Sequence, residues 1–139
     1  MSNREHKRQQ SLLPRPTSLP PDTDRVGVGA YGEYLAAQYL RSAHYLIVER
    51  NWRCRFGEID LVAQLGQMTV ICEVRTRRGH RAGSGLESVT RRKLRRLHRL
   101  ANQWQVERDS IDCPIRIDVI GIQLHIDESH TIHHVRGAG

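Results

Sequence analysis

The chain of 139 residues contains few cysteines, almost no lysine and no long apolar run. Its three cysteines, Cys54, Cys72 and Cys113, form no CxxC pair and cannot all be paired, which favours a reduced, cytoplasmic protein. Because no run of about 18 apolar residues occurs, the sequence predicts no membrane span. No apolar stretch follows the basic N-terminus, so no secretory signal is predicted. Lysine is restricted to Lys7 and Lys93, and arginine therefore carries most of the positive charge.

The formal charge of +7 is concentrated in one segment. Residues 75–99 hold ten basic side chains and one acid, Glu87, for a net charge of +9, while the rest of the chain carries −2. A cationic field of this kind attracts polyanions, among which nucleic acid is the commonest in the cytoplasm. The ordinary alternative is a solvated helix face. The segment is predicted to bind nucleic acid, with DNA as the expected ligand. The residues predicted to bind it are Arg77, Arg78, Arg91, Arg92, Lys93, Arg95, Arg96 and Arg99.

The chain divides into a tail and one domain. Residues 1–25 are rich in proline and polar residues and hold few apolar ones, so we expect a disordered tail. Residues 26–139 suffice for a single compact domain and leave no room for a second core.

Periodicity predicts two helices and five strands. Apolar residues recur at helical spacing over 28–43 and again from Thr90, a suitable N-cap, to about residue 108. In the second helix an apolar stripe lies opposite the arginines. Gly79, Gly83 and Gly85 indicate a mobile loop. The order α-β-β-β-α-β-β predicts an α/β fold with a mixed sheet flanked by helices, its strands near 45–49, 58–63, 69–75, 115–122 and 131–136.

Two of the predicted strands carry acidic residues close to a turn. Because side chains alternate along a strand, Glu58 and Asp60 are expected on one face, and Ile59 and Leu61 on the other. The short link to the next strand contains Gly66, which is typical of an antiparallel hairpin.

The register of this hairpin decides what the carboxylates face. A turn centred between Gly66 and Gln67 places Asp60 opposite Glu73, with Cβ atoms about 4.5–5.5 Å apart. Such carboxylates repel each other unless a divalent cation lies between them, and oxygen ligands suit Mg²⁺ or Mn²⁺ better than zinc. A register shifted by two residues instead pairs Asp60 with Arg75 in an ordinary ion pair. The residue pattern alone leaves both registers open.

Six short motifs occur in an order that resembles a known family. Over residues 27–122 the sequence is similar to the YraN-like family, a group of small bacterial proteins related to Holliday-junction resolvases and restriction endonucleases. The motifs are Gly32-Glu33, the segment 49–52, Gly57-Glu58-Ile59-Asp60-Leu61-Val62-Ala63, Cys72-Glu73-Val74-Arg75-Thr76-Arg77, Ser88-Val89-Thr90-Arg91-Arg92-Lys93 and Arg116-Ile117-Asp118-Val119.

The resemblance implies a restriction-endonuclease-like core with a PD-(D/E)xK type of active site. In this pattern Asp60 is the first carboxylate, Glu73 the second, and Arg75 stands at the lysine position. Glu33 matches an acidic residue that often completes the metal shell. The implied activity is hydrolysis of phosphodiester bonds in DNA, branched DNA included, dependent on Mg²⁺ or Mn²⁺.

Arginine at position 75 departs from the family pattern, because a guanidinium holds phosphate but does not release a proton near neutral pH. Lys93 is either a substitute for the missing lysine or a snorkelling side chain. The alternative function is therefore a catalytically inactive nucleic-acid-binding protein of the same fold. A third possibility is a subunit whose basic face meets an acidic protein. A homodimer is compatible with the sequence, but nothing in the sequence indicates one.

The histidines and tryptophans are predicted to be structural. His130, His133 and His134 lack a cysteine or acid at ligand spacing, which disfavours a zinc site. Trp52 and Trp104 are expected in the core rather than stacked on bases.

The sequence also predicts where Cys72, Asp118 and Glu58 lie. Cys72 alternates with valines and is expected in the core. Asp118 either supports the site or forms an ion pair with Arg116. Glu58 either lies behind the site or pairs with Arg75, which the predicted register places opposite it.

Overall fold

The structure is a computed structural model that describes residues 20, 24–79, 86 and 89–139. The order α-β-β-β-α-β-β and the mixed α/β class confirm the sequence prediction. Residues 1–19 and 21–23 of the predicted tail, and 80–85 of the predicted glycine loop, lie outside the described residues. The elements are α2 (Arg25–Ser42), β1 (Leu46–Cys54), β2 (Gly57–Leu65), β3 (Met68–Arg78), α3 (Arg91–Glu107), β4 (Ile115–Leu124) and β5 (His130–Val135).

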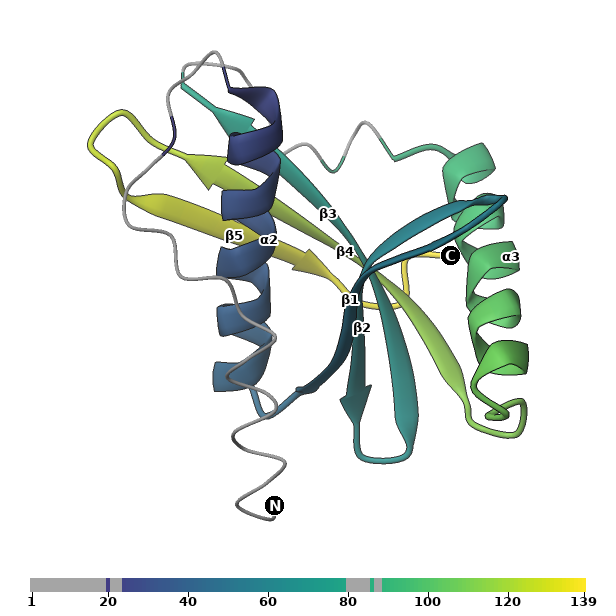
Figure 1. Ribbon diagram of the computed structural model, residues 1–139. Helices are drawn as coiled ribbons and strands as arrows, with labels where there is room; N and C mark the ends of the chain where they lie inside the picture. Colours follow the sequence, from purple (N-terminus) through teal and green to yellow (C-terminus); the bar gives the residue numbers. More distant parts are fainter. Residues whose placement is uncertain (1–19, 21–23, 80–85, 87–88) are drawn as a thin grey trace.

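One five-stranded sheet forms the centre of the fold, with the strand order β1-β2-β3-β4-β5. Neighbouring strands run antiparallel except β3 and β4, which are parallel and are connected through α3. The two helices cover opposite faces of this sheet (Figure 1). Alternation along β3 shows the two faces, because Val70 and Cys72 pack under α2 whereas Ile71 packs under α3.

Local sequence signals account for where the helices begin. The Asp24 side chain accepts a hydrogen bond of 2.8 Å from the amide of Gly27, so α2 begins one residue inside the segment that we assigned to the tail. Thr90 caps α3 as predicted, with Oγ1 accepting from the amide of Lys93 at 3.2 Å. The apolar stripe of α3 is buried and its arginines are exposed. Neither described helix is long and apolar enough to cross a membrane.

The cysteine and tryptophan predictions are confirmed. Cys72 is fully buried in the core under α2, where burial raises the pKa of its thiol. Trp52 and Trp104 are buried in the core under α3. Trp104 Nε1 also donates a hydrogen bond of 2.9 Å to Glu49.

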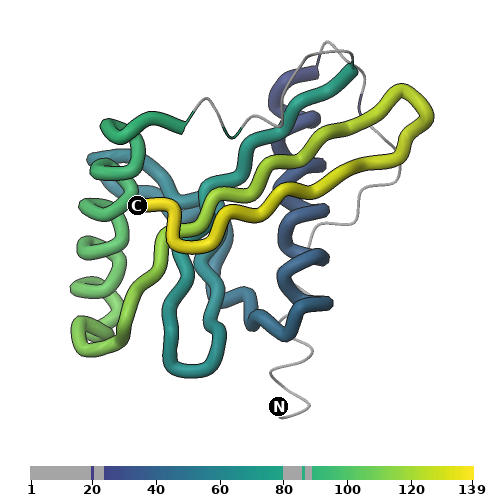
Figure 2. Tube along the Cα trace, turned by 180° about the vertical axis from the view of Figure 1, so that it is seen from behind, coloured from purple at the N-terminus to yellow at the C-terminus, as the bar shows by residue number. Residues whose placement is uncertain are grey.

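The strand β2 leaves β3 before either strand ends. The β2–β3 pairing stops at Leu61 opposite Cys72, whereas β1 and β2 stay paired as far as Cys54 and Gly57. The free part of the β1–β2 hairpin crosses the sheet and reaches α3 (Figures 1 and 2). Two-stranded ribbons twist more strongly than wide sheets, which explains this change of direction.

This twist overturns one prediction from strand alternation. Ile59 packs in the core under α3, whereas Leu61 packs under α2, so the two residues do not share a face. A strongly twisted strand turns its side chains relative to the sheet, so residues two positions apart can pack under different helices. Asp60 lies between them, at the point where β2 separates from β3.

Candidate active site

The two predicted carboxylates, Asp60 and Glu73, lie where β2 separates from β3, and we call this place the fork. Leu65 pairs with Met68 and Leu61 with Cys72, which is the register of a turn centred between Gly66 and Gln67. The register shifted by two residues is therefore wrong. One step beyond the last of these pairs, this register brings Asp60 level with Glu73.

The Asp60 side chain forms a hydrogen bond in place of the backbone pairing that ends where β2 separates from β3. Its Oδ2 accepts a hydrogen bond of 2.8 Å from the amide of Val74. This bond satisfies an amide that β2 no longer reaches, and it orients the carboxylate toward β3. Asp60 is buried, with 9% of its surface exposed.

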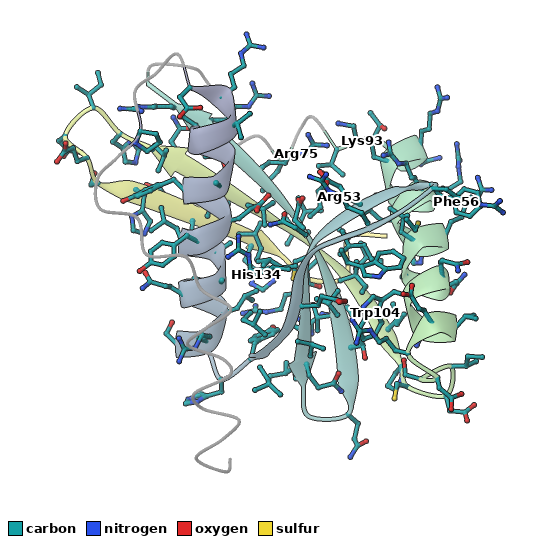
Figure 3. All side chains as sticks on the ribbon, viewed as in Figure 1. Arg53, Phe56, Arg75, Lys93, Trp104 and His134 are labelled. Atoms are coloured by element: carbon teal, nitrogen blue, oxygen red, sulfur yellow. The ribbon has the colours of Figure 1, made fainter. Side chains whose placement is uncertain are left out.

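Both carboxylates line one cavity of about 220 Å³ between the fork and α3. Charged side chains of both signs line it, together with two leucines of α3. Figure 3 shows Arg75 and Lys93 near each other between the two helices. The lining residues are Glu58, Asp60, Glu73, Arg75, Lys93, Arg96, Leu97 and Leu100.

Burial and mutual repulsion perturb the two acids. Burial, followed by the charge of Glu73, raises the pKa of Asp60 to about 8, against the lowering effect of the Val74 amide. Burial also raises the pKa of Glu73, although Arg75 and Lys93 oppose this change. Two carboxylates that resist ionisation in one cavity are a common feature of catalytic and metal-binding sites.

Glu33 lies on α2, close to this pair but outside the cavity lining. Gly32 allows the helix to approach β3, because a Cβ added there would lie 1.8 Å from Oγ1 of Thr76. The charge of Glu33 contributes to the raised pKa of Asp60, and burial raises the pKa of Glu33 itself. Within the described residues, no three acidic, histidine or cysteine side chains form a group that could chelate one ion. A role of Glu33 as a third ligand stays a prediction.

Arg75 pairs with one of the acids and keeps a free donor. Its Nη2 lies 3.0 Å from Oε1 of Glu73. Its Nε is buried and finds no hydrogen-bond partner within the described part of the chain. The predicted pairing of Arg75 with Glu58 is wrong, because Glu58 binds Arg53 at 3.0 Å on the twisted hairpin. That twist carries Glu58 away from the position opposite β3.

The predicted nucleic-acid-binding residues lie in three places. Lys93 and Arg96 line the acidic cavity, and Lys93 is only half exposed, which agrees with a place facing the site. Arg91, Arg92, Arg95 and Arg99 are exposed on the same helix. Arg77 and Arg78 lie at the far end of β3, where the Arg78 guanidinium donates to the carbonyl of Pro20.

Asp118 belongs to a separate buried network. It accepts two hydrogen bonds of 2.8 Å from Arg116 and one of 2.7 Å involving His134 Nε2. Although burial raises the pKa of Asp118, hydrogen bonds from His134 and Arg116 lower it to about 2. His134 is also bonded to the Tyr39 hydroxyl at 2.8 Å. The predictions of an Asp118–Arg116 ion pair and of a structural His134 are confirmed.

Comparisons with known proteins place the chain in a family. The sequence model of the family described as "Uncharacterised protein family UPF0102" matches residues 32–122, which run from Gly32 on α2 to Ile122 on β4. The chain belongs to the UPF0102 family. This is the YraN-like family that its motifs resemble, and the resemblance is confirmed.

Members of the UPF0102 family from several bacteria match over most of their length. A UPF0102 protein of a Nocardioides species is 47% identical over 115 residues, which are 83% of this chain and 93% of that protein. One from Kineococcus radiotolerans is 44% identical over 111 residues, or 79% of this chain and 91% of that protein.

Among solved structures, Pyrococcus furiosus SfsA in complex with Ca²⁺ is 10% identical, with a TM-score of 0.36, over 75% of this chain and 60% of that chain. This likeness is too slight to indicate the fold or the function of the chain. The relatives show the family and assign no activity to the cavity.

Proposed function

We propose that this UPF0102 protein is a metal-dependent, nuclease-like protein that hydrolyses phosphodiester bonds in DNA, branched DNA included. The observation that carries the proposal is the pair Asp60 and Glu73, two desolvated carboxylates in one cavity that raise the free energy of each other's ionised form. Two carboxylates that face each other destabilise a fold unless they bind a ligand. The cations around them attract a polyanion to the same place.

The donor set suits Mg²⁺ or Mn²⁺. Magnesium is commonly held by one or two carboxylates, with water and substrate phosphate oxygens filling its remaining positions. Asp60 and Glu73 would supply the protein ligands, and Glu33, whose charge acts on Asp60, would orient a water near them. When bound, the ion lowers the pKa of water and stabilises charge on the phosphoryl oxygens.

The basic side chains of the cavity account for substrate binding. The guanidinium of Arg75 lines the cavity and would donate hydrogen bonds to a phosphate oxygen bound there. Arg75 would then orient the phosphate and bind it electrostatically. Lys93 and Arg96, which also line the cavity, would add positive charge beside the same phosphate.

One observation favours the alternative, a catalytically inactive nucleic-acid-binding protein of the same fold. Arg75 already forms an ion pair with Glu73, which partly neutralises the acid that would hold the metal. In that case the cavity and the arginines of α3 bind DNA without cleaving it.

Cleavage assays with matched variants separate the two functions. Purified protein is incubated with supercoiled plasmid and with a four-way junction, in Mg²⁺ or Mn²⁺ and in EDTA. We expect cleavage only with metal, and a loss of at least 100-fold in Asp60→Asn and Glu73→Gln, whereas the exposed Asp112→Asn keeps wild-type activity. Equal cleavage by all variants would trace the activity to a contaminant and contradict the proposal.

Binding without cleavage would support the alternative. Neutralising Arg92, Arg95 and Arg99 one at a time should then reduce the slope of log affinity against log salt by about one for each phosphate that the variant no longer neutralises. Affinity that does not depend on salt would contradict both functions.

A further inference from the structure

The only phenylalanine of the sequence lies in an exposed turn. Phe56 follows Arg55 in the two-residue turn between β1 and β2, and 46% of its surface is exposed. It belongs to neither buried core cluster. The twist of the hairpin brings this turn to the first half of α3, as Figures 1 and 2 show, and Figure 3 labels Phe56 beside that helix.

Guanidinium groups surround the ring. The Cζ atoms of Arg55 and Arg99 lie 4.7 and 5.8 Å from the ring centroid. Arg96 reaches the backbone of the turn, where a Cβ added to Gly57 would lie 2.6 Å from its Nη2. Arg55 and Arg99 thus hold the ring beside α3, and no core packing explains its position.

A cavity of about 680 Å³ lies between the turn and α3, large enough for a nucleotide. Among the described residues that line it, every charged one is basic and Phe56 is the one aromatic. The lining residues are Phe56, Thr90, Arg92, Lys93, Arg95, Arg96 and Arg99.

This combination fits an unpaired nucleotide. Proteins bind single strands through a basic groove that contacts phosphates and through aromatic rings on which bases stack. A base inside a duplex has both faces covered by its neighbours, so only an unpaired base can stack on a side chain. A ring among guanidinium groups offers both contacts within one cavity.

We propose that the cavity between the β1–β2 turn and α3 binds an unpaired nucleotide of a nucleic acid strand, with Phe56 stacking on the base and the α3 arginines holding the adjacent phosphates. Lys93 and Arg96 line both this cavity and the acidic one. A strand anchored on Phe56 is therefore led directly to Asp60 and Glu73. The inference deepens the proposed function, on which it rests, by assigning it substrates with unpaired bases.

The test measures binding in EDTA, so that it does not depend on cleavage. The full chain is titrated against three fluorescein-labelled DNAs of equal length, namely a single-stranded oligothymidine, a duplex, and an oligonucleotide with abasic sites along its centre. For Phe56→Ala we expect a loss of about 5- to 100-fold on the single strand, which corresponds to stacking of one base. Binding to the duplex and to the abasic strand should change less than two-fold.

Two variants control for fold and for apolar area. Ile126→Ala removes an even more exposed apolar side chain in the β4–β5 turn, and it should leave all three affinities unchanged. Phe56→Leu keeps an apolar side chain without an aromatic face and should bind the single strand as weakly as Phe56→Ala. Circular dichroism checks that every variant is folded.

Other outcomes contradict the inference. Equal losses on the single strand and the duplex would make Phe56 a structural residue of the hairpin, and no loss, or no binding of the single strand by the wild type, would overturn base stacking. Single-strand binding that depends on Phe56, without any cleavage in Mg²⁺ or Mn²⁺, would leave the inference standing while the hydrolytic function failed.

Discussion

Replacing Asp60 with asparagine is expected to stabilise the metal-free protein. Asparagine is close in shape to aspartate and keeps an oxygen that can accept the hydrogen bond from Val74. The substitution removes a buried negative charge and its repulsion by Glu73. A residue kept for function at the expense of stability should behave in this way.

The magnitude follows from the perturbed ionisation. Folding raises the pKa of Asp60 from 3.8 to about 8. Each pKa unit corresponds to about 1.4 kcal/mol, so the ionised carboxylate opposes folding by at most about 4 kcal/mol at pH 7. Because water and the positive charges of the cavity screen the carboxylate, we expect a gain of about 1–2 kcal/mol in the free energy of unfolding of Asp60→Asn.

The pH dependence identifies the cause. The pKa of Asp60 is higher in the folded than in the unfolded chain, so below about pH 4 the side chain is protonated in both states and opposes folding in neither. The penalty of ionisation grows as the pH rises from there and levels off above about pH 8. The difference between Asp60→Asn and wild type should therefore be smallest at pH 4 and should increase up to pH 8.

Urea denaturation followed by the fluorescence of the buried Trp52 and Trp104 measures these differences. The exposed Asp112→Asn is the matched control and should show no gain. Mn²⁺ at 100 times its dissociation constant should stabilise the wild type by about 2.7 kcal/mol and Asp60→Asn far less. An Asp60→Asn variant that is less stable than wild type at pH 7, or a difference that does not change with pH, would refute the reasoning.

Two further predictions concern the scaffold. Gly32→Ala should destabilise the fold by about 1–3 kcal/mol, because its Cβ would overlap the Thr76 side chain; Thr76→Ala in the same chain should recover most of this loss, and Gly29→Ala, which has open space, should be stabilising. Asp118→Asn should cost about 3 kcal/mol in urea denaturation, since it leaves the Arg116 charge without its buried partner. Because folding lowers the pKa of Asp118 to about 2, its stabilisation should persist above about pH 4 and disappear as the pH falls through 2.

Much of the fold could be predicted from neighbouring residues. The cap at Thr90 and the turn at Gly66 are local features, because a cap or a tight turn involves only a few consecutive residues. The residue pattern around this turn is compatible with two registers, and the pairing of Leu61 with Cys72 selects the one that brings Asp60 level with Glu73.

Only the tertiary structure decided how these pieces serve one site. The separation of β2 from β3, the pairing of Glu58 with Arg53 and the meeting of Phe56 with Arg99 all depend on the twist of the β1–β2 hairpin toward α3. Twist accumulates over whole strands and is limited by packing against distant elements, so no short stretch of sequence contains it. The residues of the candidate site could therefore be named from the sequence, whereas the cavity that joins them could not be predicted.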